Sequence, residues 1–308
     1  MTQMAPVEAL LAVIPASGSG VDTYVNVEPL PSQKGVPFAF GGSLMGQSAM
    51  AAAATVSDTF QIYSMQSAFL RAVRGTEKVY YHVERTSDGQ TFCSRTVRVT
   101  QGDSDACAYT STVCFQRNDE KPNRNVLDYH VPMPHVGGVG PEGISSAKLQ
   151  QVMDANITRS VPLLQISAKE EPFQWRPLDS PQGLEPTEMW QRSFVRSPAF
   201  ASMNPHLHQS ALAWLSDTYT LGAALNASPG KVGKQLRNVT MGATLTNNVS
   251  FHEPMTKVDD WMLGERFTSW GANGRAVVTQ RFWDVSSGRL VFSGTQEVVI
   301  RLRDDTKL

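Results

Sequence analysis

The sequence predicts an α+β fold made of two related halves. Each half offers one helix, expected over residues 43–56 and 205–224, followed by several strand-like segments. The strands follow one another with turns between them, which favours antiparallel pairing over the alternation of helix and strand seen in parallel sheets. The spacing also indicates a repeat, because Phe69 to Gly89 spans as many residues as Phe251 to Gly271.

The first helix opens after Gly41-Gly42 and consists largely of alanine, serine and other compact residues, so it can lie close to whatever covers it. The strands that follow carry β-branched and aromatic residues with partial alternation. They are expected at 62–70, 78–85, 91–100 and 106–117. Ser87-Asp88-Gly89 is a hairpin turn signal between two of them.

The second half repeats this order. Asn204-Pro205 supplies an N-cap residue and a proline suited to the first helical position, so the second helix should start near Pro205. That start places Asp217 three turns into the helix, at its middle or beyond. The later strands are expected at 243–252, 260–268, 275–283 and 289–302, with a last turn at Ser286-Ser287-Gly288.

These elements divide the chain into an N-terminal half at 1–117, a linker at 118–172 and a C-terminal half at 173–308. The linker is rich in proline and glycine, so we expect an ordered connection made of loops. A short helix at 145–156 is the exception.

Composition excludes several classes of function. Of the 308 residues, 41% are apolar and 18% charged, as in a globular protein. The net charge of −1 gives no basic surface for nucleic acid. No stretch approaches the roughly 20 apolar residues of a membrane span. Three irregularly spaced cysteines do not suggest a disulfide framework, which favours a reducing compartment.

Asp217 is the residue that most needs an explanation. It closes a run of apolar and small residues with helical spacing, and an ionised carboxylate on the buried side of a helix is costly unless it is paired or used. The plain interpretation is that Asp217 caps a following turn through Thr218 and Thr220. The alternative is that the carboxylate is paired with another group or used in the chemistry of a site.

Many short motifs, in order along the chain, resemble the acyl-CoA thioesterase II family. In the first half they are Phe40-Gly41-Gly42 with Gly46-Gln47, Phe69-Leu70-Arg71, Asp88-Gly89-Gln90-Thr91-Phe92 with Arg95, and Phe115-Gln116. In the second half they are Arg176-Pro177, Trp190 with Arg192, His208-Gln209, Leu215-Ser216-Asp217, Ala243-Thr244-Leu245, Phe251-His252 and Gln296-Glu297. The resemblance implies a tandem hotdog fold, in which a curved antiparallel sheet wraps a long central helix twice.

The resemblance also implies a catalytic set of Asp217, Thr244 and Gln296. A carboxylate in a poorly solvated site can be the general base that deprotonates an attacking water. A hydroxyl and a carboxamide can hold that water, and backbone amides are the usual donors to the thioester oxygen.

We expect the substrate pocket to include Gly41, Gly42, Gln66, Thr246 and Asn247. Three of these positions depart from the family pattern. Thr246-Asn247 stands where the family often has Asp-His, and Gln66 stands where it often has His.

The function expected is hydrolysis of a fatty or related acyl-CoA to free acid and CoA, with no metal or redox cofactor. One alternative is a hotdog enzyme of a specialised, polyketide-like pathway that acts on an unusual or carrier-bound acyl group without hydrolysis. Another is a catalytically silent thioester-binding protein. We expect no nucleic acid partner, and a homodimer or higher homo-oligomer is an open expectation.

The sequence ends in Thr306-Lys307-Leu308. A C-terminal Ser-Lys-Leu is a peroxisomal address read by an import receptor, and this ending keeps its basic residue and its leucine. The expected location is therefore peroxisomal or cytoplasmic.

Overall fold

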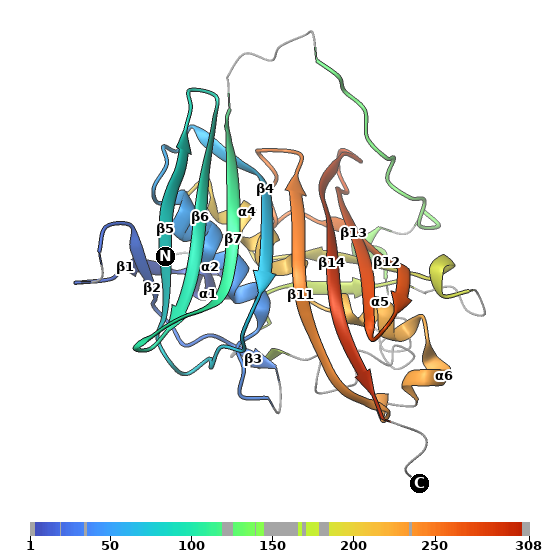
Figure 1. The fold of residues 1–308 in the computed structure, drawn as a ribbon. Helices are drawn as coiled ribbons and strands as arrows, with labels where there is room; N and C mark the ends of the chain where they lie inside the picture. Colours follow the sequence, from blue (N-terminus) through green and yellow to red (C-terminus); the bar gives the residue numbers. More distant parts are fainter. Residues whose placement is uncertain are drawn as a thin grey trace.

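One antiparallel sheet organises the protein (Figure 1). The structure is a computed structural model that describes residues 4–18, 20–33, 36–118, 126–138, 140–144, 166–167, 171–178, 185–233 and 236–303. Among these residues, 12 strands pair in the order β1-β2-β5-β6-β7-β4-β11-β14-β13-β12-β10-β9. The expected α+β class is confirmed.

The first half contains the first helix and the strands that the sequence predicts. Its elements are α1 (Pro6–Leu11), β1 (Val13–Pro15), β2 (Thr23–Asn26), β3 (Ser32–Gln33), α2 (Gly41–Ala53), β4 (Phe60–Phe69), β5 (Val79–Asp88), β6 (Phe92–Gln101) and β7 (Ser104–Arg117). The expected hairpin turn lies between β5 and β6, where the Gly89 N–H donates to the carbonyl of Phe92 at 3.0 Å. The short elements before α2 were not expected.

The second half starts with short strands that were not predicted from the sequence either. β8 (Ile166–Ser167) lies in the linker. The elements of the second half are β9 (Gln174–Pro177), β10 (Trp190–Arg196), α4 (Leu207–Ser216), α5 (Thr220–Asn226), α6 (Pro229–Val232), β11 (Val239–Phe251), β12 (Met262–Ala272), β13 (Arg275–Asp284) and β14 (Leu290–Leu302). Single 3₁₀ turns lie at Pro141–Gly143 and Pro186–Glu188. The predicted linker helix at 145–156 lies outside the described residues.

The expectation of one continuous helix over 205–224 is wrong. The helix starts at Leu207, and Asn204 instead accepts the N–H of His206 through Oδ1 at 2.9 Å. It ends at Ser216 with Asp217 as its C-cap, and Tyr219 takes a left-handed conformation with φ of 57° before α5 begins. Such a conformation is unfavourable for an aromatic residue, so surrounding contacts must maintain the break. One of them is the edge-on packing of Tyr219 against Trp175.

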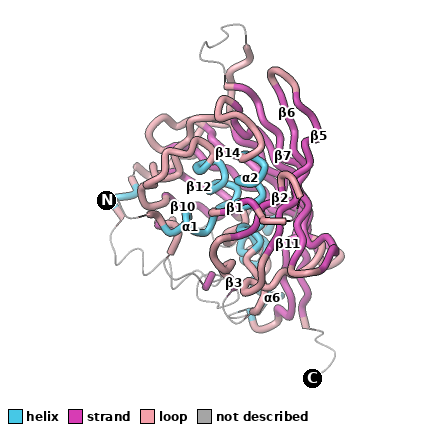
Figure 2. Tube along the Cα trace, turned by 90° about the vertical axis from the view of Figure 1, so that its left-hand side faces the viewer, coloured by secondary structure: helices cyan, strands magenta, loops and turns pink. Residues whose placement is uncertain are grey.

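The two halves join through both the sheet and the helices. Strand β4 pairs with β11, so that Ser67 lies opposite Asn247 in the middle of the sheet. The helices lie on one side of the sheet (Figure 2). There α2 packs against α4, and a side chain at Gly46 would sit 3.1 Å from the carbonyl oxygen of Ser210. The small residues of α2 therefore permit the close approach that the sequence suggests.

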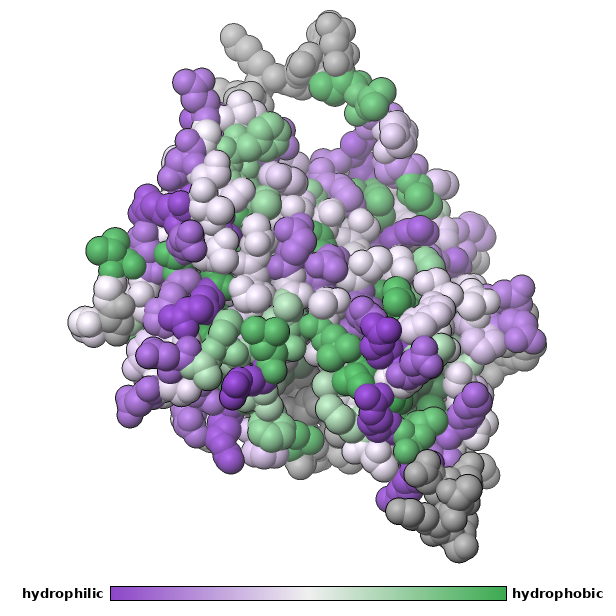
Figure 3. Space-filling model, in the orientation of Figure 1, coloured by the Kyte–Doolittle hydropathy of each residue, from purple (hydrophilic) through white to green (hydrophobic). Residues whose placement is uncertain are grey.

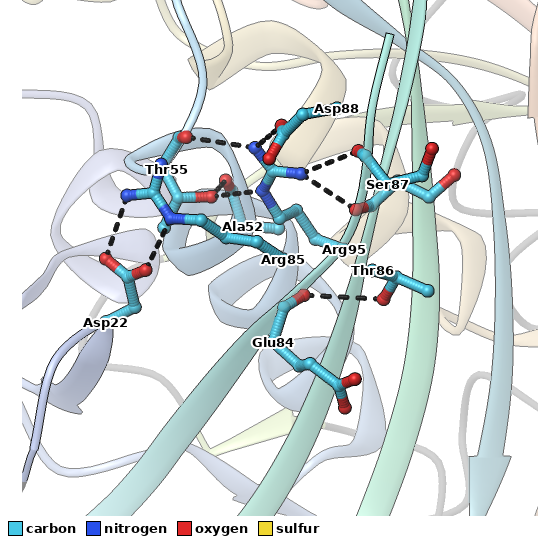
Figure 4. Close-up of polar contacts among 10 residues, drawn as sticks. Asp22, Ala52, Thr55, Glu84, Arg85, Thr86, Ser87, Asp88 and Arg95 are labelled. Atoms are coloured by element: carbon cyan, nitrogen blue, oxygen red, sulfur yellow. Dashed lines mark hydrogen bonds and ion pairs between the residues drawn. The ribbon is translucent and has the colours of Figure 1, made fainter.

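A buried arginine fixes the far end of α2 (Figure 4). Arg95 is 1% exposed and donates through Nε to Thr55 Oγ1 at 2.7 Å, and through Nη2 to the Thr55 carbonyl at 3.2 Å. It also bonds the β5–β6 turn through the Ser87 carbonyl and the Asp88 carboxylate. A cation suits this helix end, where carbonyl groups lack partners inside the helix. The contact anchors α2 to the sheet and so helps to set where its opposite end lies.

Among the described residues, no helix covers the outer face of the sheet, and this face is mildly polar. Figure 3 shows mostly pale residues over its middle and a patch of green, apolar residues below them. Along the strands, serines and threonines such as Ser64, Thr112 and Ser250 alternate with the buried positions. Within the part of the chain that the structure describes, no helix is long and apolar enough to cross a membrane.

Candidate active site

Three polar side chains from separate elements meet at the break between α4 and α5. The Asp217 carboxylate accepts hydrogen bonds at Oδ1 from Thr244 Oγ1 at 2.9 Å and from Gln296 Nε2 at 2.7 Å. Gln296 Nε2 also lies within hydrogen-bond distance of Thr244 Oγ1. The structure thus brings together the three residues that the sequence predicts as a catalytic set, although Asp217 caps the end of its helix instead of lying within it.

A β-bulge turns Thr244 toward Asp217. Alternation along β11 puts Asn247 and Val249 on the inner face, so a regular strand would place Thr244 on the outer face. The register shifts between Thr244 and Thr246, where Thr244 pairs with Val298 and Thr246 with Glu297. The extra residue, Leu245, restores Thr244 to the inner face, which is the kind of re-aiming that bulges give near active sites.

The start of α2 supplies the remaining contact to Asp217. The Gly42 N–H is a backbone hydrogen-bond donor to the carboxylate. A side chain at Gly41 would sit 2.6 Å from Asp217 Oδ2 and 2.8 Å from the Phe69 ring, so it would force one of these side chains or the start of α2 to move. The positive end of a helix dipole stabilises an anion, and the first N–H groups of a helix are free to donate. The site is therefore built from both halves.

Burial makes Asp217 a weaker acid than an ordinary aspartate. Desolvation raises its pKa to about 6, against the opposing effect of hydrogen bonds from Thr244, Gln296 and Gly42. A carboxyl group with this pKa is largely ionised at neutral pH yet remains a fair proton acceptor. Perturbed values of this kind, with identified causes, mark candidate functional sites.

Aromatic side chains of the first half form the wall opposite this carboxylate. The Phe69 and Tyr109 rings pack edge-on at 5.0 Å, and the Tyr109 hydroxyl lies 2.8 Å from Ser67 Oγ. Burial, with a smaller contribution from the charge of Asp217, raises the pKa of Tyr109 well above its ordinary value. The phenol of Tyr109 therefore stays neutral throughout the pH range in which Asp217 gains or loses its proton.

Not all of the expected pocket residues lie here. Gly41 and Gly42 border Asp217, and Asn247 is buried just behind it. The structure does not bring Gln66 to the site: it is exposed and bonds Ser64 Oγ on the outer face. Thr246 follows the bulge and alternates with Asn247, so it also lies on the outer face.

The plain interpretation of Asp217 as a turn cap does not describe the structure. Thr220 Oγ1 donates to the Ser216 carbonyl, not to Asp217, and Thr218 Oγ1 has no hydrogen-bond partner among the described residues. Two buried polar residues near the site, Tyr109 and Gln280, were not predicted from the sequence. Their only signal was an inward position on a predicted strand.

The chain resembles acyl-CoA thioesterases along most of its length. The family described as "Acyl-CoA thioesterase N-terminal domain" matches residues 29–116, and that described as "Acyl-CoA thioesterase C-terminal domain" matches residues 141–300. Acyl-coenzyme A thioesterase 8 of Mus musculus is 30% identical over 92% of this chain and 89% of its own length. Peroxisomal acyl-coenzyme A thioester hydrolase 1 of Saccharomyces cerevisiae is 30% identical over 45% of this chain and 38% of its own.

Solved structures agree on the fold. The acyl-CoA thioesterase II TesB2 of Mycobacterium marinum superposes with a TM-score of 0.71 at 22% identity, covering 97% of this chain and 99% of that one. A hot dog fold protein of Alicyclobacillus acidocaldarius gives a TM-score of 0.65 at 15% identity, covering 98% and 100%. The tandem hotdog expected from the sequence is thereby confirmed.

Proposed function

This chain belongs to the acyl-CoA thioesterase family and is a thioester hydrolase, and we propose that Asp217, Thr244 and Gln296 activate the water that attacks the thioester. The observation that carries the proposal is the shared contact at Asp217 Oδ1. The proposed substrate pocket lies between the halves, bordered by Gly41, Gly42 and Phe69.

The orientation of Gln296 supports a water-holding role. Its Nε2 faces the carboxylate, so its Oε1 points elsewhere, and that buried oxygen has no hydrogen-bond partner among the described residues. A water that donates one proton to Asp217 and the other to Gln296 Oε1 would keep a lone pair for the thioester carbon. Thr244 Oγ1 would hold the Asp217 carboxylate in place.

The proposed reaction is direct hydrolysis. The water oxygen bonds to the thioester carbon while Asp217 takes one of its protons, and the carbonyl oxygen becomes an oxyanion. Backbone N–H groups at the start of α2, other than that of Gly42, which donates to Asp217, are candidates to stabilise that charge. The carbon–sulfur bond then breaks, the free acid forms, and Asp217 returns its proton to the departing CoA thiolate.

A single turnover in ¹⁸O-labelled water tests this route. We expect one ¹⁸O in the acid from the first turnover, detected by mass spectrometry, because water attacks the acyl carbon itself. A first-turnover acid without label, together with label in Asp217, would contradict direct attack and indicate an acyl-aspartate intermediate. Measuring thiol release across acyl-CoA chain lengths on the same preparation would define the preferred acyl group.

We also propose a peroxisomal location. The yeast relative is named a peroxisomal enzyme, which supports this choice over the cytoplasm. The predicted import signal, Thr306-Lys307-Leu308, lies outside the described residues and stays a prediction. Fluorescence of the tagged full chain, compared with the same chain lacking these three residues, would test it: wholly cytosolic fluorescence of the full chain would reject it.

The division of the chain and its assembly are further parts of the proposal. We place the boundaries of the halves at 1–117 and 173–308, with the linker at 118–172. A homodimer or higher homo-oligomer is compatible with the wide, mildly polar outer face of the sheet. Light scattering of the purified chain would show its mass in solution.

A further inference from the structure

Two buried carboxamides lie behind Asp217 and have no part in the proposed hydrolysis. They are Asn247 on β11 and Gln280 on β13, and neither side chain is exposed (0%). Both contact Ser216, the last residue of α4 and the neighbour of Asp217 in the chain.

Their contacts satisfy the end of α4. The last carbonyls of a helix have no partner within it, and the Ser216 carbonyl receives Gln280 Nε2 at 2.8 Å and Thr220 Oγ1 at 2.9 Å instead. Asn247 Nδ2 donates to Ser216 Oγ at 3.1 Å. That hydroxyl in turn donates to the Ala213 carbonyl at 2.7 Å.

These contacts fix which way each carboxamide faces. The Ser216 carbonyl can only accept, so Gln280 must present its NH₂ group. The Ser216 hydroxyl gives its proton to Ala213, so it accepts from Asn247, which must also present its NH₂ group. An apolar side chain of similar size would fill the same space and lose these donors.

The Ser216 carbonyl belongs to the same rigid peptide plane as the Asp217 nitrogen. Holding that carbonyl therefore sets the orientation of the backbone from which the Asp217 side chain extends. We propose that Asn247 and Gln280 are positioning residues for thioester hydrolysis, which fix the end of α4 and so hold the Asp217 carboxylate against Thr244, Gln296 and the start of α2.

This inference rests on the proposed role of Asp217 as the base. If the end of α4 loosens, the hydrogen bonds from Thr244, Gln296 and Gly42 weaken while desolvation persists, so the pKa of Asp217 should rise further. Among the described residues of the first half, Tyr109 is the titratable group that the charge of Asp217 affects, and its raised pKa keeps it neutral. A shift of the apparent pKa on the acidic side of the pH–activity profile would therefore reflect a change in the pKa of Asp217.

The test compares Gln280→Met and Asn247→Leu with Asn248→Ala, a control on the exposed outer face of β11, next to Asn247. For both core variants we expect kcat to fall about tenfold, since small misplacements of a catalytic group are costly. We expect KM to change little. In the plot of kcat against pH, the apparent pKa on the acidic side should rise by roughly half a pH unit. Asn248→Ala should match the wild type.

Thr220→Val is a milder variant, because it removes one donor to the Ser216 carbonyl and keeps the shape of the side chain. It should lower kcat and raise the apparent pKa of the pH–kcat profile, as the two core variants do. Variants that unfold at lower temperature but keep the wild-type kcat and apparent pKa would overturn the positioning role. If Asp217→Asn is inactive while Gln280→Met is fully active, the positioning role alone fails. If Asp217→Asn stays active, the proposed function fails first.

Discussion

Asp217 lies between two helix ends with opposite effects on its charge. It caps the C-terminus of α4, where the helix dipole disfavours an anion, and it accepts the Gly42 N–H at the N-terminus of α2, where the dipole favours one. Its pKa of about 6 reflects burial opposed by specific donors. The residue is therefore ionised at neutral pH at some cost to the folded protein.

Replacing Asp217 by Asn should lower turnover by roughly 10²–10⁴-fold, the usual contribution of a positioned acid or base. Asn keeps the shape of the side chain, so acyl-CoA binding should persist. Thiol release measures the first effect, and calorimetric titration with a substrate acyl-CoA measures the second. Near wild-type hydrolysis would remove Asp217 from the mechanism.

Activity should rise with pH through about 6, because the base must be ionised. The same raised pKa means that Asp217 costs stability above that pH, while the protonated form below the ordinary aspartate pKa costs none. Asp217→Asn should therefore raise the free energy of unfolding by about 1 kcal/mol at pH 8, a figure reduced because the Asp217 residue as a whole is only half-buried, and have little effect near pH 3. Denaturant titrations at the two pH values check this, and equal effects at both would contradict it.

Motifs predicted which side chains meet at Asp217 better than which residues lie beside it. The identities of Asp217, Thr244 and Gln296 followed from resemblance, but alternation alone would have turned Thr244 outward. The bulge that corrects this has no evident signal in the sequence. Gln66 and Thr246 were assigned by motif position, and their place on the outer face depends on strand register, which is set by long-range pairing.

At the scale of elements, the close approach of α2 to Asp217 depends on glycine. The eight long strands, β4 to β7 and β11 to β14, were predicted to within a few residues because their alternation and turns are local, whereas the short strands were not predicted. The break after α4 was not, because Tyr219 adopts a conformation that its own preferences disfavour and that tertiary contacts maintain.

Gly41→Ala should reduce kcat by more than tenfold, since its methyl group would meet Asp217 Oδ2 and the Phe69 ring. The control is Gly230→Ala, where a methyl group meets nothing within 4 Å. Alanine favours helix over glycine, so a general loss of helix stability should not explain the effect. Full activity in Gly41→Ala would show that the start of α2 can yield without disturbing the base.

At the scale of the whole molecule, the halves are related but not equivalent. The first helix carries Gln47, which accepts from the Tyr81 hydroxyl at 2.6 Å and donates to the Leu10 carbonyl at 2.8 Å. It contributes a hydrogen-bonded carboxamide and no carboxylate, while α4 ends in Asp217. One half therefore provides the proposed base, Asp217, and the other provides the backbone donor to it and the aromatic side chains beside it.

One active site per chain is expected from this asymmetry. Titration with a non-hydrolysable acyl-CoA thioether should saturate at one equivalent per chain. The chain with Asp217→Asn should bind the same single equivalent. Two equivalent sites would show that the first half holds a second centre.

The pairing of β4 with β11 has a consequence for how activity responds to dilution. Because this seam and the contact of α2 with Asp217 lie within one polypeptide, the halves meet at an effective concentration that does not depend on how much protein is present. The specific activity of the intact chain should stay constant on dilution. Two co-produced polypeptides, 1–125 and 126–308, would instead obey mass action and lose specific activity as they are diluted.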